Sequence, residues 1–294
     1  MAHMPIKSYA RENSPLYGMP SRRKLTELLR INMKQLRRLS GDLHLYSHFP
    51  VPKKDGSSRM VDNPRDELKR VQRRIAKFLG RILPPDILFC PVKGRSYVDN
   101  AGQHRSHRVI HSLDVQKYFP NTKSQRVYWF FHSVMLCPPD VAAVLTKIAC
   151  RDGHLSTGSP LSPIMAYYTH VDVWEKVARI AKANGCVVSI WIDDITVSGP
   201  KLPTSVIWDI KHAIHAGGLR YHKEKRAVDR RAEVTGVVIR DGKLLPPNRQ
   251  WRKLRNLKRE VHREHQPERN RSLIGRLAGM NGQVAQIAAG NVEP

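Results

Sequence analysis

Two apolar, β-branched runs separated by a pair of aspartates form the clearest pattern in this chain. The runs cover residues 187–192 and 195–198, with Asp193 and Asp194 between them. Such runs on either side of two turn-type residues predict a β-hairpin. Its tip would hold two carboxylates side by side. Their repulsion, about 4 kcal/mol at about 4 Å and an effective dielectric constant of about 20, would be relieved by a divalent cation.

The periodicity of the remaining chain predicts an α+β protein. Helices are expected where apolar residues recur every three to four positions, and strands where short apolar runs lie between turn residues. The predicted helices are 21–39, 67–83, one with Ser124 as its N-cap, a long apolar one that follows the turn-rich segment 153–163 and ends at Asn184-Gly185, one from Thr204 to Gly217-Gly218, and 250–276. The predicted strands are two within 46–61 around Asp55-Gly56, one over 108–115, and the pair 234–239 and 243–245 around Asp241-Gly242.

The charge balance indicates a polyanionic partner. The 51 Lys and Arg outnumber the 25 Asp and Glu, which gives a net charge of +26. Because basic residues run through the whole chain rather than along one amphipathic helix, we expect nucleic acid as the partner and not a membrane surface. No apolar run approaches the length of a membrane span, and the four cysteines lack metal-ligand spacing. We therefore expect a reducing compartment, the cytoplasm.

Three aspartates at the ends of predicted strands suggest metal-assisted phosphoryl transfer. This reaction needs carboxylates from separate segments that converge on one point. Asp114, at the end of strand 108–115, can join Asp193 and Asp194 there. Magnesium suits such a site because it accepts few carboxylates together with substrate phosphates. Candidate groups for an incoming nucleoside triphosphate are the cations Lys53, Lys54, Arg59 and Lys225 and the turn Thr157-Gly158.

The order and spacing of these blocks resemble the successive motifs of a reverse transcriptase. The resemblance extends from about residue 46 to residue 288 and covers the segments 51–59, 62–64 with 68–72, 113–120, 155–163, 191–194 and 218–225. It implies a right-hand polymerase fold with fingers, a palm built on an antiparallel sheet and a small helical thumb. It also implies two Mg²⁺ ions at Asp114, Val115, Asp193 and Asp194, and Phe119 as a steric gate against the ribose 2′-hydroxyl.

Two short signatures narrow the resemblance to bacterial retron reverse transcriptases. Residues 100–104 match an Asn-Ala-x-x-His signature, and residues 234–236 match a Val-Thr-Gly signature. The retron resemblance implies a structured noncoding RNA that serves as template and primer, and synthesis from an internal guanosine 2′-hydroxyl to give branched RNA–DNA. It further implies deoxynucleotide substrates and action with an effector protein in defence against phage. Asn100, His104 and Thr235 are the RNA-binding residues that these signatures supply.

The resemblance divides the chain into three parts. Residues 1–45 form a basic helical segment, residues 46–240 form the fingers and palm, and residues 241–294 form a basic thumb. In the thumb we expect RNA contacts from Lys253, Arg255, Lys258 and Arg259. The chain departs from the usual motifs at three positions, where Trp191 replaces Tyr, Ser156 replaces Pro and His222 replaces Asn.

Two alternatives remain open at this point. One is another bacterial reverse transcriptase, of the group II intron or diversity-generating kind. The other is a catalytically silent RNA-binding protein with the same fold. The three intact aspartates argue against the second alternative.

Overall fold

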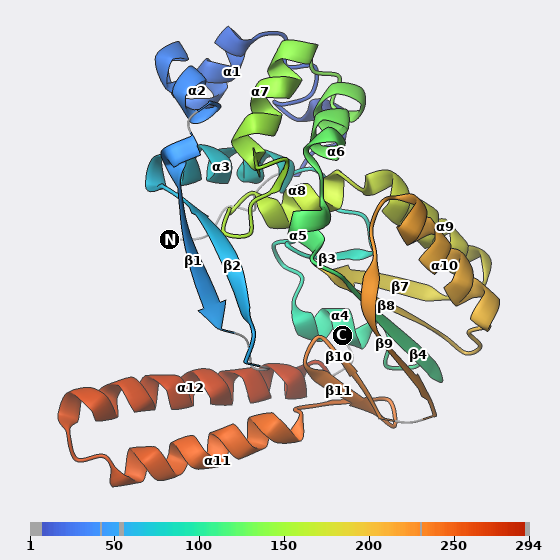
Figure 1. The fold of residues 1–294 in the computed structure, drawn as a ribbon. Coiled ribbons are helices and arrows are strands. Elements are labelled where there is room, and N and C mark those ends of the chain that lie inside the picture. Colours follow the sequence, from blue (N-terminus) through green and yellow to red (C-terminus); the bar gives the residue numbers. More distant parts are fainter. Residues whose placement is uncertain (1–7, 42, 53–55, 230, 292–294) are drawn as a thin grey trace.

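A five-stranded sheet lies at the centre of the structure, with the strand order β3-β7-β8-β4-β9 (Figure 1). The computed structural model describes residues 8–41, 43–52, 56–229 and 231–291. Strand β4, an interior strand of this sheet, has five of its seven residues buried, as expected for a strand covered on both faces. The sheet strands are β3 (Leu88–Cys90), β4 (Val109–Val115), β7 (Val187–Trp191), β8 (Asp194–Gly199) and β9 (Tyr221–Val228).

The sheet is mixed, so the prediction of an antiparallel sheet is wrong at one edge, where β3 lies. Strand β3 runs parallel to β7, and the Ile190 amide donates to the Ile87 carbonyl at 2.7 Å. A tight hairpin forces its two strands to be antiparallel, whereas a long connection allows either direction. Residues 91–186 connect β3 to β7, so tertiary packing decides that these two strands pair in parallel.

Helices α9 (Val171–Ala183) and α10 (Thr204–Ala216) pack on each other, and α9 also contacts β7. The long helix expected before Asn184 is two helices, α8 (Ser162–Tyr168) and α9. The break follows from local competition for one carbonyl. The Thr169 hydroxyl donates to Ala166 O at 3.1 Å, and the His170 ring lies 3.0 Å from the same oxygen. Side chains that bond the backbone in this way interrupt the helical hydrogen-bond ladder.

A helical lobe and a long hairpin lie beside the sheet (Figure 1). The hairpin pairs Tyr46 with Pro64 and Pro52 with Ser58, which confirms the predicted strands, while its tip at 53–55 lies outside the described residues. The lobe's remaining short elements are η1, η2, the turn helix α5, the π-helical η3 and the strand pair β5–β6. The elements are η1 (Arg11–Asn13), α1 (Arg22–Leu29), α2 (Met33–Leu39), η2 (Leu43–Leu45), β1 (Tyr46–Pro52), β2 (Ser58–Pro64), α3 (Asp66–Leu79), α5 (Tyr118–Asn121), α6 (Ser124–Trp129), η3 (Phe130–Val134), α7 (Pro139–Ala149), β5 (Cys150–Arg151) and β6 (His154–Leu155).

Three predicted helices of this lobe need correction. The helix expected over 21–39 is split into α1 and α2, because Arg30 adopts a left-handed conformation with φ of 58° and Asn32 caps α2 together with Gln35. Helix α6 begins at Ser124, but the N-cap is Lys123 and no side chain caps it. The helix expected over 67–83 is present as α3, but it ends at Leu79, with Gly80 as its C-cap, short of the predicted end.

The C-terminal part combines a small sheet with a helical hairpin. The strand expected over 234–239 is interrupted by a turn at Thr235 and Gly236, which have φ values of 46° and 84°. The helix expected over 250–276 is also divided, because Pro267 begins a second helix and disfavours helical geometry at Gln266. The elements are β10 (Ala232–Val234), β11 (Val237–Arg240), β12 (Lys243–Leu245), α11 (Asn248–Arg263) and α12 (Pro267–Ala289).

A short helix, α4 (Tyr97–Gly102), connects this C-terminal part to the central sheet. Val98 and Ala101 of α4 lie in a second apolar cluster with residues of β10, β11 and β12 and with Ile287 of α12. Just after α4, His104 is fully buried. Its Nδ1 lies 2.6 Å from the Ser198 hydroxyl and its Nε2 lies 2.7 Å from the Ser189 hydroxyl. One imidazole therefore ties together β7 and β8, the two strands of the predicted hairpin.

Within the part of the chain that the structure describes, no helix combines the length and apolar character needed to cross a bilayer.

His104 gives a prediction for the pH dependence of stability. Burial, followed by the nearby His107, lowers the pKa of His104 from 6.5 to about 3. Below about pH 6.5 His104 becomes protonated in the unfolded chain but stays neutral in the folded protein. The free energy of unfolding therefore falls as the pH drops from about 6.5 towards 3. In His104→Gln, the free energy of unfolding between about pH 7 and about pH 5 should fall less steeply, by up to about 1.4 kcal/mol per pH unit.

Urea unfolding of both proteins at several pH values measures this difference. His212→Gln, at an exposed position of α10, is the matched control and should keep the wild-type slope. Equal slopes for wild type and His104→Gln would contradict a buried, neutral His104.

Candidate active site

The three aspartates gather at one end of the β4–β8 pair. Asp114 of β4 lies directly opposite Asp194 of β8 in the antiparallel register. Asp193 is in the adjacent turn, where its carbonyl accepts a hydrogen bond of 2.8 Å from the Val115 amide. The convergence expected from the sequence is thus present in the fold.

The hairpin itself is confirmed, but its turn is shifted by one residue. The two turn residues are Ile192 and Asp193, whereas Asp194 is already the first residue of β8 and pairs with Trp191. Ile192 has a φ of 57°, which is uncommon for a β-branched residue and costs about 1–3 kcal/mol. The shift matters because it turns Asp194 towards Asp114.

Burial and mutual repulsion perturb the carboxylates. Burial and, after it, the charges of Asp193 and Asp114 raise the pKa of Asp194 to about 6, although Lys225 and Lys223 lower it. Burial also raises the pKa of Asp193. A backbone hydrogen bond opposes that rise, Asp114 adds to it, and His222 and Arg59 oppose it. Opposed like charges in neighbouring strands destabilise a sheet, so this arrangement favours a bound cation.

His222 is a site residue that the sequence motif pattern did not identify. Strand β9 pairs Lys223 with Asp114 and Tyr221 with Val115, which leaves His222 as the extra residue of a β-bulge. Its Nδ1 lies 3.4 Å from the Asp114 carboxylate. Bulges near active sites redirect side chains. The only sequence signal was the replacement of the usual Asn by His.

A cleft of about 280 Å³ lies beside the carboxylates. It is lined by Asp114 and Asp194, by Lys225 of β9, and by Thr235 and Gly236 of the β10–β11 turn. Of the predicted phosphate-binding cations, the structure therefore brings Lys225 into the cleft. Arg59 is exposed on β2, and its charge acts on Asp193. Lys53 and Lys54 lie outside the described residues.

The turn that contains Thr157 and Gly158 is fixed to β2. The Thr157 hydroxyl accepts from the Asp62 amide at 2.9 Å, and the Gly158 amide donates to the Asp62 carbonyl at 3.0 Å. A Cβ atom at position 158 would lie 2.6 Å from that carbonyl, which explains the glycine. These contacts attach the β1–β2 hairpin to the body of the protein.

The segments 100–104 and 234–236, which carry the two signatures, contact each other in the fold, but two of the signature residues are buried in the protein interior. Asn100 and His104 are buried, so the structure offers them no direct contact with RNA, contrary to what the signatures implied. The Asn100 side-chain amide donates to the Thr235 hydroxyl at 3.3 Å, across 135 positions of sequence. Asn100 therefore helps to hold the β10–β11 turn in its place at the cleft.

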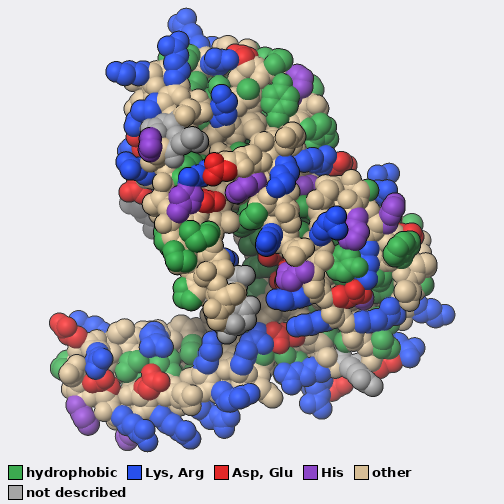
Figure 2. Space-filling model, viewed as in Figure 1, with side chains coloured by type: hydrophobic (Ala, Val, Ile, Leu, Met, Phe, Trp, Pro, Cys, Tyr) green, Lys and Arg blue, Asp and Glu red, His purple; other side chains and the backbone are tan. Residues whose placement is uncertain are grey.

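The remaining predicted residues lie at the edge of the site or away from it. Phe119 of α5 is half-buried against the main core and stacks on Tyr118, without lining the cleft. The four basic thumb residues are all exposed along α11, where Lys and Arg side chains gather in Figure 2. They are Lys253, Arg255, Lys258 and Arg259.

The donor set fits magnesium only in part. Among the described residues, no group of three or more His, Cys, Asp or Glu side chains is close enough to hold a metal ion. Magnesium, however, is commonly bound by one or two carboxylates together with substrate phosphates. The opposed pair Asp114 and Asp194 fits a site of that kind, which the substrate completes.

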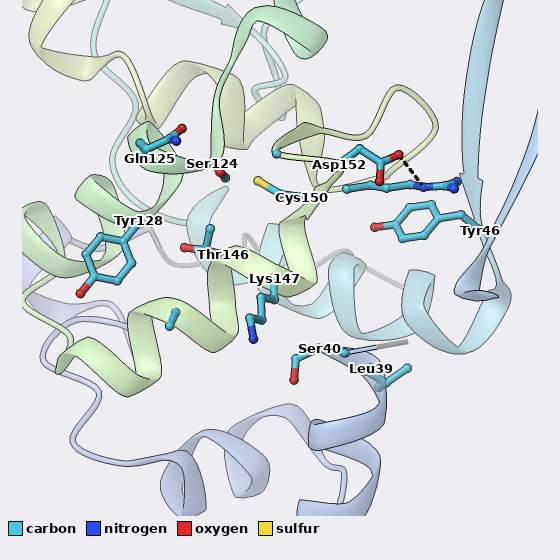
Figure 3. A pocket seen from close by; sticks show the side chains of 14 residues that line it. Leu39, Ser40, Tyr46, Ser124, Gln125, Tyr128, Thr146, Lys147, Cys150 and Asp152 are labelled. Carbon is cyan, nitrogen blue, oxygen red and sulfur yellow. Dashed lines mark ion pairs between the residues drawn. The ribbon is translucent and has the colours of Figure 1, made fainter. Parts of the chain in front are cut away.

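A larger cavity of about 670 Å³ lies away from the carboxylates (Figure 3). It is lined by residues of α2, α6 and α7 and by Tyr46, with the Arg151–Asp152 ion pair of 3.2 Å at its edge. None of its lining residues belongs to the strands that carry the aspartates. We therefore place the candidate active site at the smaller cleft.

Comparison with known proteins agrees with the motifs. The chain is 25% identical over 283 residues to the retron Se72 reverse transcriptase of Salmonella heidelberg, which covers 90% of this chain and 74% of that protein. It is 25% identical over 252 residues to the retron Ec86 reverse transcriptase of Escherichia coli, covering 81% and 77%. It is 27% identical over 272 residues to the retron Mx162 reverse transcriptase of Myxococcus xanthus, covering 80% of this chain and 56% of that protein.

These relatives confirm the predicted resemblance to retron reverse transcriptases and, with it, the enzyme class, RNA-directed DNA polymerase. No protein-family model matches the chain. The chain spans about three quarters of the Se72 and Ec86 proteins and little more than half of the Mx162 protein.

Proposed function

We propose that this chain, whose relatives are retron reverse transcriptases, copies part of a partner noncoding RNA into DNA, priming from an internal guanosine 2′-hydroxyl to give branched RNA–DNA. The observation that carries the proposal is the pairing of Asp114 with Asp194 beside Asp193, next to a cleft that also contains Lys225. Retron enzymes work with a noncoding RNA template, which fits the net charge of +26.

The proposal assigns the parts of the fold to a right-hand polymerase. Residues 46–240 would supply the fingers, with the β1–β2 hairpin, and the palm, with the central sheet. Residues 241–294 would supply the thumb through α11 and α12, and residues 1–45 a basic helical extension. The β1–β2 hairpin and the helices α11 and α12 lie outside the central sheet, and this arrangement supports the division (Figure 1).

Two Mg²⁺ ions are proposed at Asp114, Val115, Asp193 and Asp194. Because the Val115 side chain is buried and has no donor atom, only its main-chain carbonyl can serve. When bound, such ions stabilise charge on the attacking and leaving oxygens of the phosphoryl transfer. Lys53, Lys54, Arg59 and Lys225 would hold the triphosphate, and the attachment of Thr157 and Gly158 to β2 would orient the fingers hairpin over it.

Other functions are less well supported. The relatives compared above are all named retron reverse transcriptases, which does not favour an enzyme of the group II intron or diversity-generating kind. A catalytically silent RNA-binding protein would not need three partly buried carboxylates in one place. The family resemblance extends the proposal to an effector protein and to defence against phage.

Replacement of single carboxylates tests the proposed chemistry. Asp114→Asn or Asp193→Asn should abolish DNA synthesis from an annealed primer with magnesium and leave RNA affinity within about twofold, because the carboxylates hold metal rather than the body of the RNA. Asp209→Asn, at an exposed position of α10, is the control and should extend the primer normally. Normal extension by either site variant would overturn the metal assignment.

Phe119 tests the proposed steric gate. Phe119→Val should increase ribonucleotide incorporation relative to deoxyribonucleotide incorporation, because the smaller side chain would leave room for a 2′-hydroxyl. Single-nucleotide incorporation assays measure the ratio. An unchanged ratio would mean that Phe119 serves only to pack against Tyr118 and the core.

The basic surface of α11 tests the proposed thumb. Neutralising Lys253, Arg255, Lys258 and Arg259 to Gln should weaken binding of structured RNAs in general. It should also flatten the log–log dependence of affinity on salt by about one unit for each lost phosphate contact. Neutralising four exposed cations elsewhere, Lys176, Arg179, Lys182 and Lys201, is the matched control. Equal effects of the two sets would show that net charge, not the thumb, determines affinity.

A further inference from the structure

A third cavity, of about 490 Å³, lies between the central sheet and the helical hairpin. Its walls come from α4, the end of β7, the β10–β11 turn, α11 and α12. Two aromatic rings, Tyr97 and Trp191, line it together with Thr235, Arg249, Lys253 and Met280. Segments from distant parts of the sequence, including both short signatures or their neighbours, thus form one pocket.

The lining of this pocket suits an anion attached to a flat ring. None of its lining residues is acidic, while Arg249 and Lys253 contribute positive charge. Arg249 forms an ion pair with Glu233. Lys253 is exposed and has no ion-pair partner in the described part of the chain. Trp191 and Tyr97 are half-exposed and offer ring faces for stacking.

The pocket adjoins the catalytic cleft. Trp191, Thr235 and Gly236 line both cavities, and Asp194 is the strand partner of Trp191. A ligand seated here would therefore lie beside the nucleic acid that reaches the carboxylates. Because the two cavities share these three residues, the same nucleic acid is the natural occupant.

The walls are also held in place before any ligand binds. The Thr235 hydroxyl donates to the Tyr97 carbonyl at 3.0 Å and accepts from Asn100. The Gln250 amide donates to Gln283 at 3.0 Å and so joins α11 to α12. A pocket with fixed walls loses less entropy on binding than a surface that must first be ordered.

We propose that this pocket binds one unpaired nucleotide of the RNA, with its base stacked between Trp191 and Tyr97 and its phosphate near Arg249 and Lys253. This inference rests on the proposed function, because it takes the partner to be RNA. A paired duplex presents phosphates and edges to a protein, whereas an unpaired base can enter a cavity and stack on aromatic rings. The concave shape therefore selects an unpaired nucleotide.

Photocrosslinking tests the proposal without requiring DNA synthesis. The probe is a short RNA hairpin with a single-stranded uridine tail that carries one thiouridine. A blunt hairpin with thiouridine inside its stem is the paired control. With the full-length protein, the tailed probe should crosslink to a peptide that contains Tyr97 or Trp191, and the blunt probe should not.

Two variants with the same added bulk locate the contact. Met280→Trp fills the pocket and should abolish this adduct and weaken binding of the tailed hairpin by about tenfold, the size of one lost base–aromatic stack. Ile274→Trp places the same side chain at an exposed position of α12 outside the pocket and should leave the adduct and the affinity unchanged. Gln283→Glu adds a negative charge to the pocket rim, which tests the site without added bulk, and should also weaken binding.

Several results would overturn the proposal. They are equal crosslinking of the paired and tailed probes, an adduct that maps elsewhere on the protein, or full binding by both Met280→Trp and Gln283→Glu once circular dichroism shows that they are folded. A protein that makes DNA but forms no adduct with the tailed probe overturns only the pocket proposal and leaves the polymerase proposal intact. Conversely, a protein that crosslinks as expected but makes no DNA overturns only the polymerase proposal.

Discussion

The register between β4 and β8 is the constraint on which the candidate site depends. Pairing Asp114 with Asp194 places two carboxylates on one face of the sheet. A shift by one residue would move one of them to the opposite face, because side chains alternate along a strand. Burial, followed by the repulsion from Asp193 and Asp114, raises the pKa of Asp194 to about 6. A sheet that keeps this arrangement without a cation loses stability, and the site is therefore one where cation binding and catalytic geometry coincide.

The contacts around α4 hold that register. His104 reaches Ser189 and Ser198 on the two strands of the hairpin, and Asn100 reaches Thr235 on the far side of α4. Buried polar groups that find partners make a packed interior specific, because each misplaced partner would leave an unsatisfied group costing about 1–3 kcal/mol. His104 and Asn100 thus stabilise the structure around the cleft, and Thr235 lines it. Asn100 contributes to the proposed RNA site by fixing the position of Thr235.

The hairpin β1–β2 and the helices α11–α12 approach the site from different parts of the chain. The hairpin is attached where Asp62 meets Thr157 and Gly158, and the end of α12 is attached where Asn291 bonds both backbone groups of Leu244. Each of these attachments is local, whereas β4 pairs along most of its length with β8 and β9. A polymerase needs such an arrangement, because its substrate must enter between the parts and the product must leave.

The sequence alone determined the local features: the β7–β8 hairpin, the β1–β2 hairpin, the strand that delivers Asp114, and the family motifs. These depend on hydrophobic periodicity and turn chemistry, which act between neighbouring residues. The breaks at Thr169-His170 and before Pro267 have local causes, which hydrophobic periodicity alone does not detect. Only the tertiary structure decided the parallel pairing of β3, the bulge at His222, and the burial of Asn100 and His104. Each of these depends on partners distant in sequence. The turn shift at Ile192 belongs with them, because the strained φ of that residue is tolerated only where the surrounding strands fix both of its ends.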